Sequence, residues 1–283
     1  HLTGSLRRRP TLGAAGDPAG PSPGRAARPL AATAPTTTAR HLSCTGRIGQ
    51  PGCFGQGADF TWQAEARKEA VTGLFVVFEG GDGVGKSTQV TLLVDWFTAH
   101  GHRAQRTHQP GDTAIGRQLR QIVLDPRSGD IDPRAEALLL AADKAQHLRE
   151  VVRPTLAGGV HVVCDRYIDS MIAYQGAGRE LDAGEIAVLA EWATTGLVPD
   201  LTILLDIDPQ KAVQQKADRD RVEDAGAAFH ARVRDGFLAC AAAAPQRYLV
   251  LPALTGVDDL AAEVQERVAQ LMVTRGLTGA DDG

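Results

Sequence analysis

The sequence predicts an α/β fold in which a parallel five-stranded sheet is flanked by helices on both faces. Short continuous apolar runs, typical of strands buried on both faces, recur between residues 73 and 251. Stretches with the apolar spacing of amphipathic helices separate these runs. Because parallel strands need helical crossovers between them, this alternation over about 200 residues predicts a parallel sheet covered on both sides.

Five segments are the expected strands: 73–80, 102–107, 159–165, 201–207 and 247–251. The first reads GLFVVFEG and the fourth LTILLDI, so each is almost entirely apolar inside. A helix is expected after residue 85, because Val90, Leu93 and Phe97 keep helical spacing. Four more helices are expected at 133–156, 183–194, 225–243 and 257–271.

Composition excludes several classes of protein. Of the 283 residues, 43% are hydrophobic and 23% are charged, which is typical of a folded domain with a sizeable core. No run approaches 18 consecutive apolar residues, so a membrane partner is not expected. The four cysteines lie far apart and form no CxxC pair, which argues against a zinc ribbon or a disulfide scaffold.

The chain divides into three parts by composition. Residues 1–70 are predicted to be a disordered head rich in proline, glycine and arginine, 71–275 the folded domain, and 276–283 a disordered tail. The first 59 residues hold seven arginines against two aspartates, so the remainder is acidic and no nucleic-acid partner is expected. We expect a cytoplasmic protein, or an organellar one if the head is a transit peptide.

The strongest chemical motif follows the first expected strand. Residues 80–88 fit the phosphate-binding pattern Gly-x-x-x-x-Gly-Lys-Ser/Thr and precede an expected helix. Its glycines let backbone N–H groups face phosphate oxygens, and the helix N-terminus favours the anion. Lys86 should reach the β- and γ-phosphates of a nucleoside triphosphate, and the Ser87 hydroxyl should ligate magnesium. The expected ATP-binding residues of this loop are Gly80, Gly81, Asp82, Gly83, Val84, Gly85, Lys86, Ser87 and Thr88.

Other residues narrow the class of P-loop protein. The chain contains no asparagine, so it lacks the Asn-Lys-x-Asp loop with which GTP-binding switches read guanine. A small nucleotide kinase needs a carboxylate near the magnesium, a cation for the acceptor phosphate and a mobile basic segment. Asp165 and Arg166 end an expected strand, where ligands bind in such sheets, or alternatively start a helix beside a surface arginine. The segment 214–224, with Arg219 and Arg221, is a candidate basic lid or a solvated helix face.

Several separate stretches of the chain are similar to one known family. They read FEGGDGVGKSTQ, PGDTAIGRQLR, LLLAADKAQH, DRYIDSMIAYQGAGREL, TTGLVPDLTILLDIDP and DRVEDAGAAFHARVR. From about residue 73 to 272 the chain resembles bacterial thymidylate kinases of the actinobacterial type. This resemblance implies a P-loop kinase fold, usually a homodimer, and magnesium-dependent transfer of the γ-phosphoryl group of ATP to dTMP, giving dTDP.

The resemblance also implies roles for individual residues. Lys86, Arg166 and Asp165 would be catalytic, with magnesium held by Ser87 and Asp165. Arg166 would hold the dTMP phosphate, and Tyr174 would close the pocket where a ribose 2′-hydroxyl would lie. The acceptor site would be formed by Asp82, Pro110, Leu140, Lys144, Arg166, Met171, Tyr174 and Gln175.

The lid has its own implied roles. Arg221 would be a catalytic arginine at the transition state, because Gly83 stands where some relatives have an arginine in the P-loop. Arg219 would assist it in binding ATP. Gln214 and Gln215 stand where arginines are frequent in the family.

The departures from the family pattern cluster on the acceptor side. This chain reads THQPGDT where the family usually reads TREPGGT, so His108 and Gln109 replace an arginine and a carboxylate. Leu140 stands at a usually aromatic position, Lys144 at an arginine, and Met171 at a serine or asparagine. Three outcomes are therefore open: a slower thymidylate kinase, a kinase for another nucleoside monophosphate, or a non-catalytic ATP-binding copy.

Overall fold

The computed structural model describes residues 73–208, 211 and 220–277. The expected head at 1–70 and most of the expected tail lie outside this range, so these predictions stay predictions. Within it, the fold prediction is confirmed: the sheet has five strands, all parallel, in the order β2-β3-β1-β4-β5. The strands are β1 (Phe75–Gly80), β2 (Ala104–His108), β3 (His161–Asp165), β4 (Leu201–Asp206) and β5 (Tyr248–Pro252).

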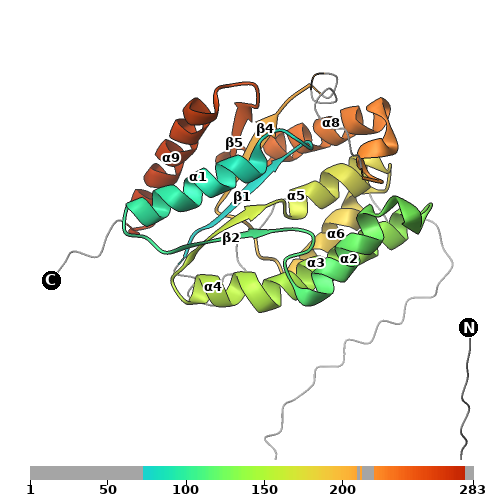
Figure 1. Cartoon of the computed structure of the whole chain (residues 1–283), viewed down its shortest axis with the longest axis horizontal. Coiled ribbons are helices and arrows are strands. Elements are labelled where there is room, and N and C mark those ends of the chain that lie inside the picture. Colours follow the sequence, from blue (N-terminus) through green and yellow to red (C-terminus); the bar gives the residue numbers. More distant parts are fainter. Residues whose placement is uncertain (1–72, 209–210, 212–219, 278–283) are drawn as a thin grey trace, which may run out of the picture. The chain divides into compact units, whose positions relative to one another are not determined.

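Helices cover both faces of the sheet, as the alternating pattern predicts (Figure 1). On one face, α1 (Lys86–Ala99) and α9 (Val257–Thr274) pack on Val76 and Phe78 of β1. Phe75 and Val77 point to the opposite face, because successive side chains of a strand alternate. That face is covered by α3 (Pro133–His147), α4 (Arg153–Ala157), α6 (Ala183–Thr194) and α8 (Ala227–Ala243).

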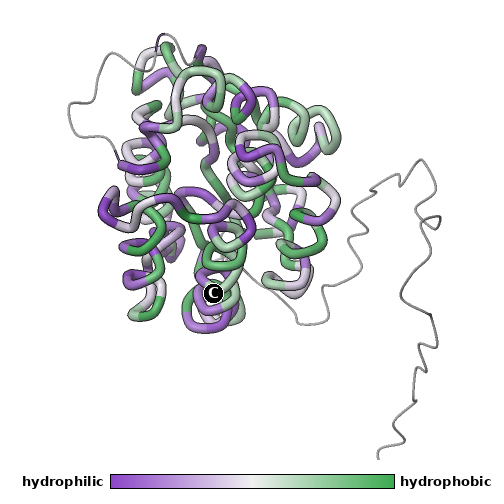
Figure 2. The backbone as a smooth tube through the Cα atoms, turned by 90° about the vertical axis from the view of Figure 1, so that its right-hand side faces the viewer, coloured by the Kyte–Doolittle hydropathy of each residue, from purple (hydrophilic) through white to green (hydrophobic). Residues whose placement is uncertain are grey.

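The pattern of residue hydropathy along the helices explains this layering. Figure 2 shows hydrophobic and hydrophilic residues alternating around the helices, as expected for helices with one buried face. In α1, for example, Val90, Leu93 and Phe97 are buried in the core, while its remaining positions are mostly exposed. Burial of such apolar side chains between the helices and the sheet stabilises the fold most, because hydrophobic burial is the dominant favourable term in the free energy of folding.

Three helical segments differ from the sequence prediction. The helix expected at 133–156 contains a π-helical stretch, η3 (Leu148–Val152), between α3 and α4. α2 (Ala114–Leu124) was not predicted, although the Thr113 hydroxyl caps it by accepting from the Gly116 N–H at 2.9 Å. α5 (Ile168–Met171) and the π-helical η4 (Ile172–Gly178) were also missed.

Tertiary packing explains why η4 is helical despite its glycines. A Cβ at Gly178 would lie 2.6 Å from the ring of Phe229 on α8, so only glycine lets the two segments approach. Ala173 and Tyr174 of η4 share a core cluster with Phe229 and Phe237. This contact between distant segments leaves no periodic pattern in residues 168–178.

The strand order creates a crevice at the carboxyl ends of β1 and β3. The chain leaves β1 toward β2 on one side and leaves β3 toward β4 on the other, so these neighbouring strands flank a topological switch point. Phe78 of β1 pairs with Asp165 of β3, which itself pairs with His108 of β2. The P-loop and the Asp165-Arg166 pair therefore begin side by side at one edge of the sheet.

Candidate active site

The P-loop has the backbone geometry of an anion-binding turn. Gly80, Gly83 and Gly85 have φ angles of 132°, 72° and 94°, in the region that favours glycine. A Cβ at Gly80 would lie 2.4 Å from the Leu205 carbonyl oxygen. At the start of α1 the N-cap residue is Gly85, which has no side chain to cap the helix, and the first turn holds no acidic residue. The N-terminus of α1 is thus open to a negatively charged ligand.

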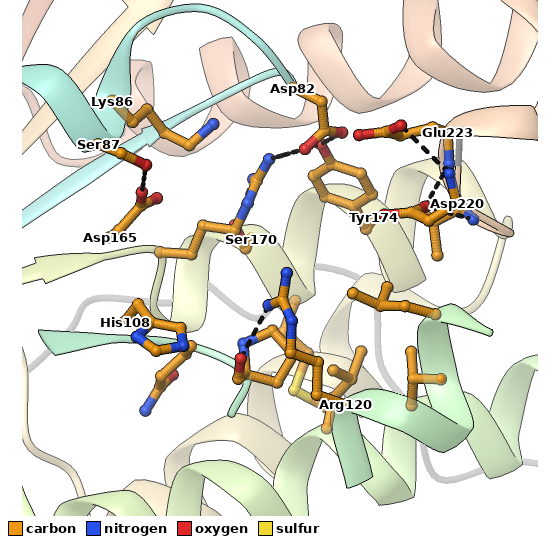
Figure 3. Close-up of a pocket in the computed structure, with 18 of the residues that line it drawn as sticks. Asp82, Lys86, Ser87, His108, Arg120, Asp165, Ser170, Tyr174, Asp220 and Glu223 are labelled. Atoms are coloured by element: carbon orange, nitrogen blue, oxygen red, sulfur yellow. Dashed lines mark hydrogen bonds and ion pairs between the residues drawn. The ribbon is translucent and has the colours of Figure 1, made fainter. Parts of the chain in front are cut away.

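A cavity of about 600 Å³ extends from this loop to the acceptor-side residues (Figure 3). It brings together fifteen of the residues predicted from the sequence. From the P-loop and α1 these are Asp82, Gly83, Val84, Gly85, Lys86, Ser87 and Thr88, and from other elements Pro110, Leu140, Lys144, Asp165, Arg166, Met171, Tyr174 and Gln175. Gly80, Gly81 and Arg221 are not among its lining residues.

Lys86 lies inside the P-loop with little solvent exposure. Its Nζ donates to the Gly81 carbonyl oxygen and, at 3.3 Å, to the Gly80 carbonyl oxygen. Burial and the nearby Arg166 guanidinium lower the pKa of Lys86 to about 8. An incoming phosphate would therefore meet a cation that the protein keeps poorly solvated, a setting that strengthens charge–charge attraction.

Ser87 and Asp165 form the candidate magnesium site. The Ser87 hydroxyl donates to Asp165 Oδ2 at 2.6 Å, so the first turn of α1 and the end of β3 meet there (Figure 3). Hydroxyl and carboxylate oxygens are ligands that Mg²⁺ accepts, and the remaining positions are usually filled by phosphates and water. Within the described part of the chain, no cluster of three or more His, Cys, Asp or Glu side chains could hold a metal alone. The pair thus fits a metal that arrives with a nucleotide.

Arg166 connects the P-loop to the acceptor side. Its Nη1 donates to the Gly80 carbonyl oxygen at 2.9 Å and to the Ser170 hydroxyl at 3.0 Å. Its Nη2 donates to Asp82 Oδ1 at 2.6 Å and to the Tyr174 hydroxyl at 3.1 Å. The Tyr174 hydroxyl also donates to Asp82 Oδ2 at 2.8 Å. Although burial alone would raise it, the charges of Arg166 and Lys86 lower the pKa of Asp82, which is therefore ionised.

The backbone around Arg166 is held by a carboxylate that the sequence analysis missed. Arg166 has a φ of 68°, which is uncommon for a residue other than glycine. The buried Glu79 Oε1 accepts the N–H groups of Tyr167 and Ser170 at 2.8 and 3.0 Å, and its Oε2 accepts the Ser170 hydroxyl. These bonds secure the turn that aims Arg166 at the cavity. The FEGGDG stretch contains Glu79, but only the fold shows what it contacts.

Two of the departures from the family pattern, Gln109 and Lys144, belong to one largely buried network. Lys144 Nζ donates to Gln109 Oε1 at 3.1 Å, and Gln109 Nε2 donates to His147 Nδ1 at 2.7 Å. His147 Nε2 then bonds the Thr107 hydroxyl at 2.5 Å, and that hydroxyl donates to Asp112. Burial lowers the pKa of His147 to about 4, so the ring is neutral and can accept on one nitrogen and donate on the other.

The other substituted positions line the same cavity. Leu140 and Met171 add apolar surface to it, and His108 lies at its edge, 3.7 Å from Asp112. Arg120, on the unpredicted α2, also lines the cavity and donates to the Pro110 carbonyl oxygen at 2.9 Å (Figure 3). Arg120 therefore adds a further cation to the acceptor side, and it lies within the family-like stretch PGDTAIGRQLR.

Arg221 contacts α2 and α3 and is not among the residues that line the cavity. Its Nε donates to the Val123 carbonyl oxygen at 2.8 Å, and its Nη2 donates to the buried Glu136 carboxylate. Arg179 and Gln175 donate to the same carboxylate. Arg219, Gln214 and Gln215 lie outside the described residues. The role of Arg221 at the transition state stays a prediction.

Comparisons with known proteins agree with this geometry. A family model described as thymidylate kinase matches residues 78–264, which is more than half of the chain. The chain belongs to the thymidylate kinase family. A thymidylate kinase of Cutibacterium acnes is 56% identical over 71% of this chain and 98% of its own length. A thymidylate kinase of Bifidobacterium longum is 46% identical over 71% of this chain and 100% of its own length.

A solved structure supports the same assignment of fold. The crystal structure of thymidylate kinase from Ehrlichia chaffeensis aligns with a TM-score of 0.58 and 28% identity, covering 69% of this chain and 98% of that one. The thymidylate kinase match begins within β1 and ends within α9, so it contains the end of β1 and all of β2, β3, β4 and β5. No helix of the described residues is long and apolar enough to cross a membrane.

Nucleotide binding to this member of the thymidylate kinase family should weaken at alkaline pH. Because burial lowers the pKa of Lys86 to about 8, the nucleotide-free protein loses this positive charge as the pH rises through that value. Phosphate groups lose their last proton near pH 6, so the ligand does not change charge in this window. We expect the Kd for a non-hydrolysable ATP analogue to rise about 25-fold between pH 7.5 and 9.5, if only the protonated form of Lys86 binds it. Titration calorimetry at fixed ionic strength measures it.

The control for this pH dependence is Lys86→Ala. Its affinity should be weak and nearly independent of pH over the same range, because the titrating group is gone. An equally steep loss of affinity in Lys86→Ala would assign the dependence to another group.

Proposed function

We propose that this chain transfers the γ-phosphoryl group of ATP to the 5′-phosphate of dTMP, giving dTDP and ADP. The observation that carries the proposal is one continuous cavity, with Lys86 and Ser87 at one end and Lys144 and Gln175 at the other. Arg166 lies between them, hydrogen-bonded to the P-loop and to Tyr174. Membership of the thymidylate kinase family supports the identity of both substrates.

The P-loop end is suited to the triphosphate. The open N-terminus of α1 and the buried Lys86 ammonium would neutralise the charge of the phosphates. Ser87 and Asp165 would hold Mg²⁺, which supplies further charge neutralisation when bound. A second cavity of about 210 Å³, bordered by Gly85, Gln89 and Leu254, adjoins the loop and would accept the nucleoside of ATP.

The other end is suited to a deoxynucleoside monophosphate. Asp82 and Tyr174 hold the Arg166 guanidinium group at the cavity, where its positive charge would attract the acceptor phosphate. Arg106 and Arg120 place further guanidinium groups in the same cavity. The family resemblance implies that the Tyr174 ring, which lines this cavity, would exclude a ribose 2′-hydroxyl and so favour deoxynucleotides. Catalysis would consist of positioning the two phosphates in line and neutralising charge, without a covalent enzyme intermediate.

An acceptor panel tests the proposed function. The full chain is incubated with ATP and Mg²⁺, and ADP release is measured with dTMP, dUMP, dCMP, dGMP, dAMP or UMP as acceptor. We expect the highest kcat/KM with dTMP. A higher value for another acceptor would mean that Leu140 and Met171 have retuned the base pocket. No turnover with any acceptor, in protein that binds ATP, would leave only a non-catalytic ATP-binding role.

We also propose that the chain is a homodimer. Three helices carry apolar side chains that are largely exposed: Ile115 and Ile122 on α2, Leu138 on α3, and Val188 and Trp192 on α6. These helices pack in sequence, α2 against α3 and α3 against α6, and so form one side of the domain (Figure 1). Exposed apolar patches of this kind mark protein interfaces, and the resemblance supports a second copy of the chain as the partner. A cytoplasmic location stays a prediction.

Charged substitutions should dissociate this dimer. Leu138 is 59% and Trp192 77% exposed, so Leu138→Glu with Trp192→Glu would bury two carboxylates at the interface without affecting the monomer core. Light scattering after gel filtration should show the mass of one chain instead of two. Val273→Glu is the control, because Val273 is 66% exposed on α9, which covers the opposite face of the sheet. A dimer that persists in the double variant would refute the proposed surface.

A further inference from the structure

Glu136, in the first turn of α3, is a buried carboxylate that several distant side chains contact. It has no solvent exposure. Gln175 Nε2 donates to its Oε1 at 2.9 Å, Arg179 donates to both of its oxygens at 3.1 Å, and Arg221 donates to its Oε2. Burial opposes ionisation, but hydrogen bonds from Arg179 and Arg221 lower the pKa of Glu136. The group is therefore an ionised carboxylate, which can only accept hydrogen bonds.

This charge determines the orientation of the Gln175 amide. A glutamine amide has a donor end and an acceptor end, and either can face a neighbour that both donates and accepts. Since Glu136 only accepts, Gln175 must turn its Nε2 toward it. The other polar atom of that side chain, Oε1, is an acceptor, and Gln175 lines the acceptor end of the cavity beside Met171 and Tyr174.

The lining of the same cavity also includes a matching donor. Lys144 lines it, and its Nζ is held by the Gln109 amide oxygen at 3.1 Å. An ammonium group only donates, whereas the oriented Gln175 amide offers an acceptor. Thymine presents a carbonyl oxygen and a ring N–H side by side on its pairing edge. Cytosine presents an amino group and a ring nitrogen with a lone pair there, so both of its groups would face a group of the same kind.

We infer that Glu136 is a positioning residue for selection of the acceptor base. It acts through Gln175, by holding the amide so that its oxygen faces the base. The cavity then favours a pyrimidine with a ring N–H, such as thymine or uracil, over cytosine. This inference rests on the proposed function, because it presumes that a nucleoside monophosphate occupies the cavity. A mismatched base would leave buried polar groups unpaired, which is the usual source of strong discrimination.

Glu136→Gln tests this inference. A neutral amide at position 136 can donate as well as accept, so Gln175 becomes free to turn. We expect the ratio of kcat/KM for dTMP to that for dCMP to fall at least about tenfold. A purely structural role would lower both values together and leave the ratio unchanged. Arg179→Lys is the matched control, because it alters a partner of the same carboxylate while Glu136 stays ionised, so its ratio should match wild type.

A double-mutant cycle tests whether Glu136 acts through Gln175. In Gln175→Leu the oriented amide is absent, so adding Glu136→Gln should change the dTMP to dCMP ratio no further. If turnover of a variant is too slow to measure, the ratio of the Kd values for dTMP and dCMP, measured by calorimetry, is compared instead of the ratio of kcat/KM values. Glu136→Asp provides a second variant if Glu136→Gln fails to fold, because a carboxylate on a shorter side chain no longer reaches the Gln175 amide, which now lies 2.9 Å away, so the ratio should also fall.

The outcomes separate this inference from the proposed function. A wild-type chain that phosphorylates another acceptor in preference to dTMP, or none, refutes the proposed function. A wild-type chain that prefers dTMP, together with an unchanged ratio in folded Glu136→Gln, overturns only the role of Glu136. The role of Glu136 is also overturned if Glu136→Gln lowers the dTMP to dCMP ratio as much in the Gln175→Leu variant as in the wild-type chain.

Discussion

Replacing Lys86 with alanine should lower kcat for phosphoryl transfer to dTMP by at least about 10³-fold. The Lys86 ammonium is held inside the P-loop by the Gly80 and Gly81 carbonyl oxygens, where it can follow the charge that develops on the transferred group. Alanine offers neither charge nor donor. A coupled ADP-release assay with saturating ATP, Mg²⁺ and dTMP measures the loss.

The fold itself should tolerate this change. Burial disfavours the charged form of Lys86, as its lowered pKa shows, so its removal relieves an unfavourable burial. We expect the thermal midpoint of Lys86→Ala to be no lower than that of wild type, by circular dichroism. Turnover within tenfold of wild type would refute the assignment of Lys86 to the phosphates.

The second large effect is expected at Arg166. Arg166→Lys should lower kcat/KM for dTMP by about 10²–10³-fold while leaving the Kd for ATP nearly unchanged. The guanidinium group makes four hydrogen bonds from two nitrogens, to the P-loop, Ser170, Asp82 and Tyr174. A lysine has one nitrogen and cannot bridge these groups while also meeting an acceptor phosphate.

The control for Arg166→Lys is Arg127→Lys, which makes the same substitution at an exposed position. Arg127 pairs with Asp125 but is 84% exposed, so Arg127→Lys should leave both constants within twofold of wild type. Steady-state kinetics with dTMP varied, and calorimetry with an ATP analogue, separate the two effects of Arg166→Lys. An equal loss of ATP affinity would move Arg166 from the acceptor to the donor phosphates.

Much of the fold could be predicted because the apolar patterns that indicate its strands and helices lie within single stretches of the sequence. The residues of β1 and β4 are apolar almost throughout, and only strands covered on both faces bury such runs. α2 and η4 could not be predicted in this way. α2 exposes most of its residues, and Gly178 of η4 packs against Phe229 of α8, which lies about fifty residues later in the chain.

The site divides in the same way. The P-loop is a continuous motif whose glycines and Lys86 act through their own backbone, so spacing alone predicts a phosphate site. Glu79 and Glu136 have no such local pattern, because their partners, Ser170 and Gln175, come from distant elements. From the sequence pattern alone, a carboxylate beside an apolar run is expected to lie on the surface. Only the tertiary structure shows which groups donate hydrogen bonds to it.

The sequence alone determined the five parallel strands, the helices with clear apolar stripes, the phosphate-binding loop and the family resemblance, since each depends on stretches of residues close together in the chain. The tertiary structure decided which charges meet. It places the substituted residues Gln109 and Lys144 in one hydrogen-bonded network with His147, and it pairs Arg221 with Glu136 instead of the P-loop. Hydrogen bonds act over about 3 Å, so contacts between distant segments depend on how the whole chain packs.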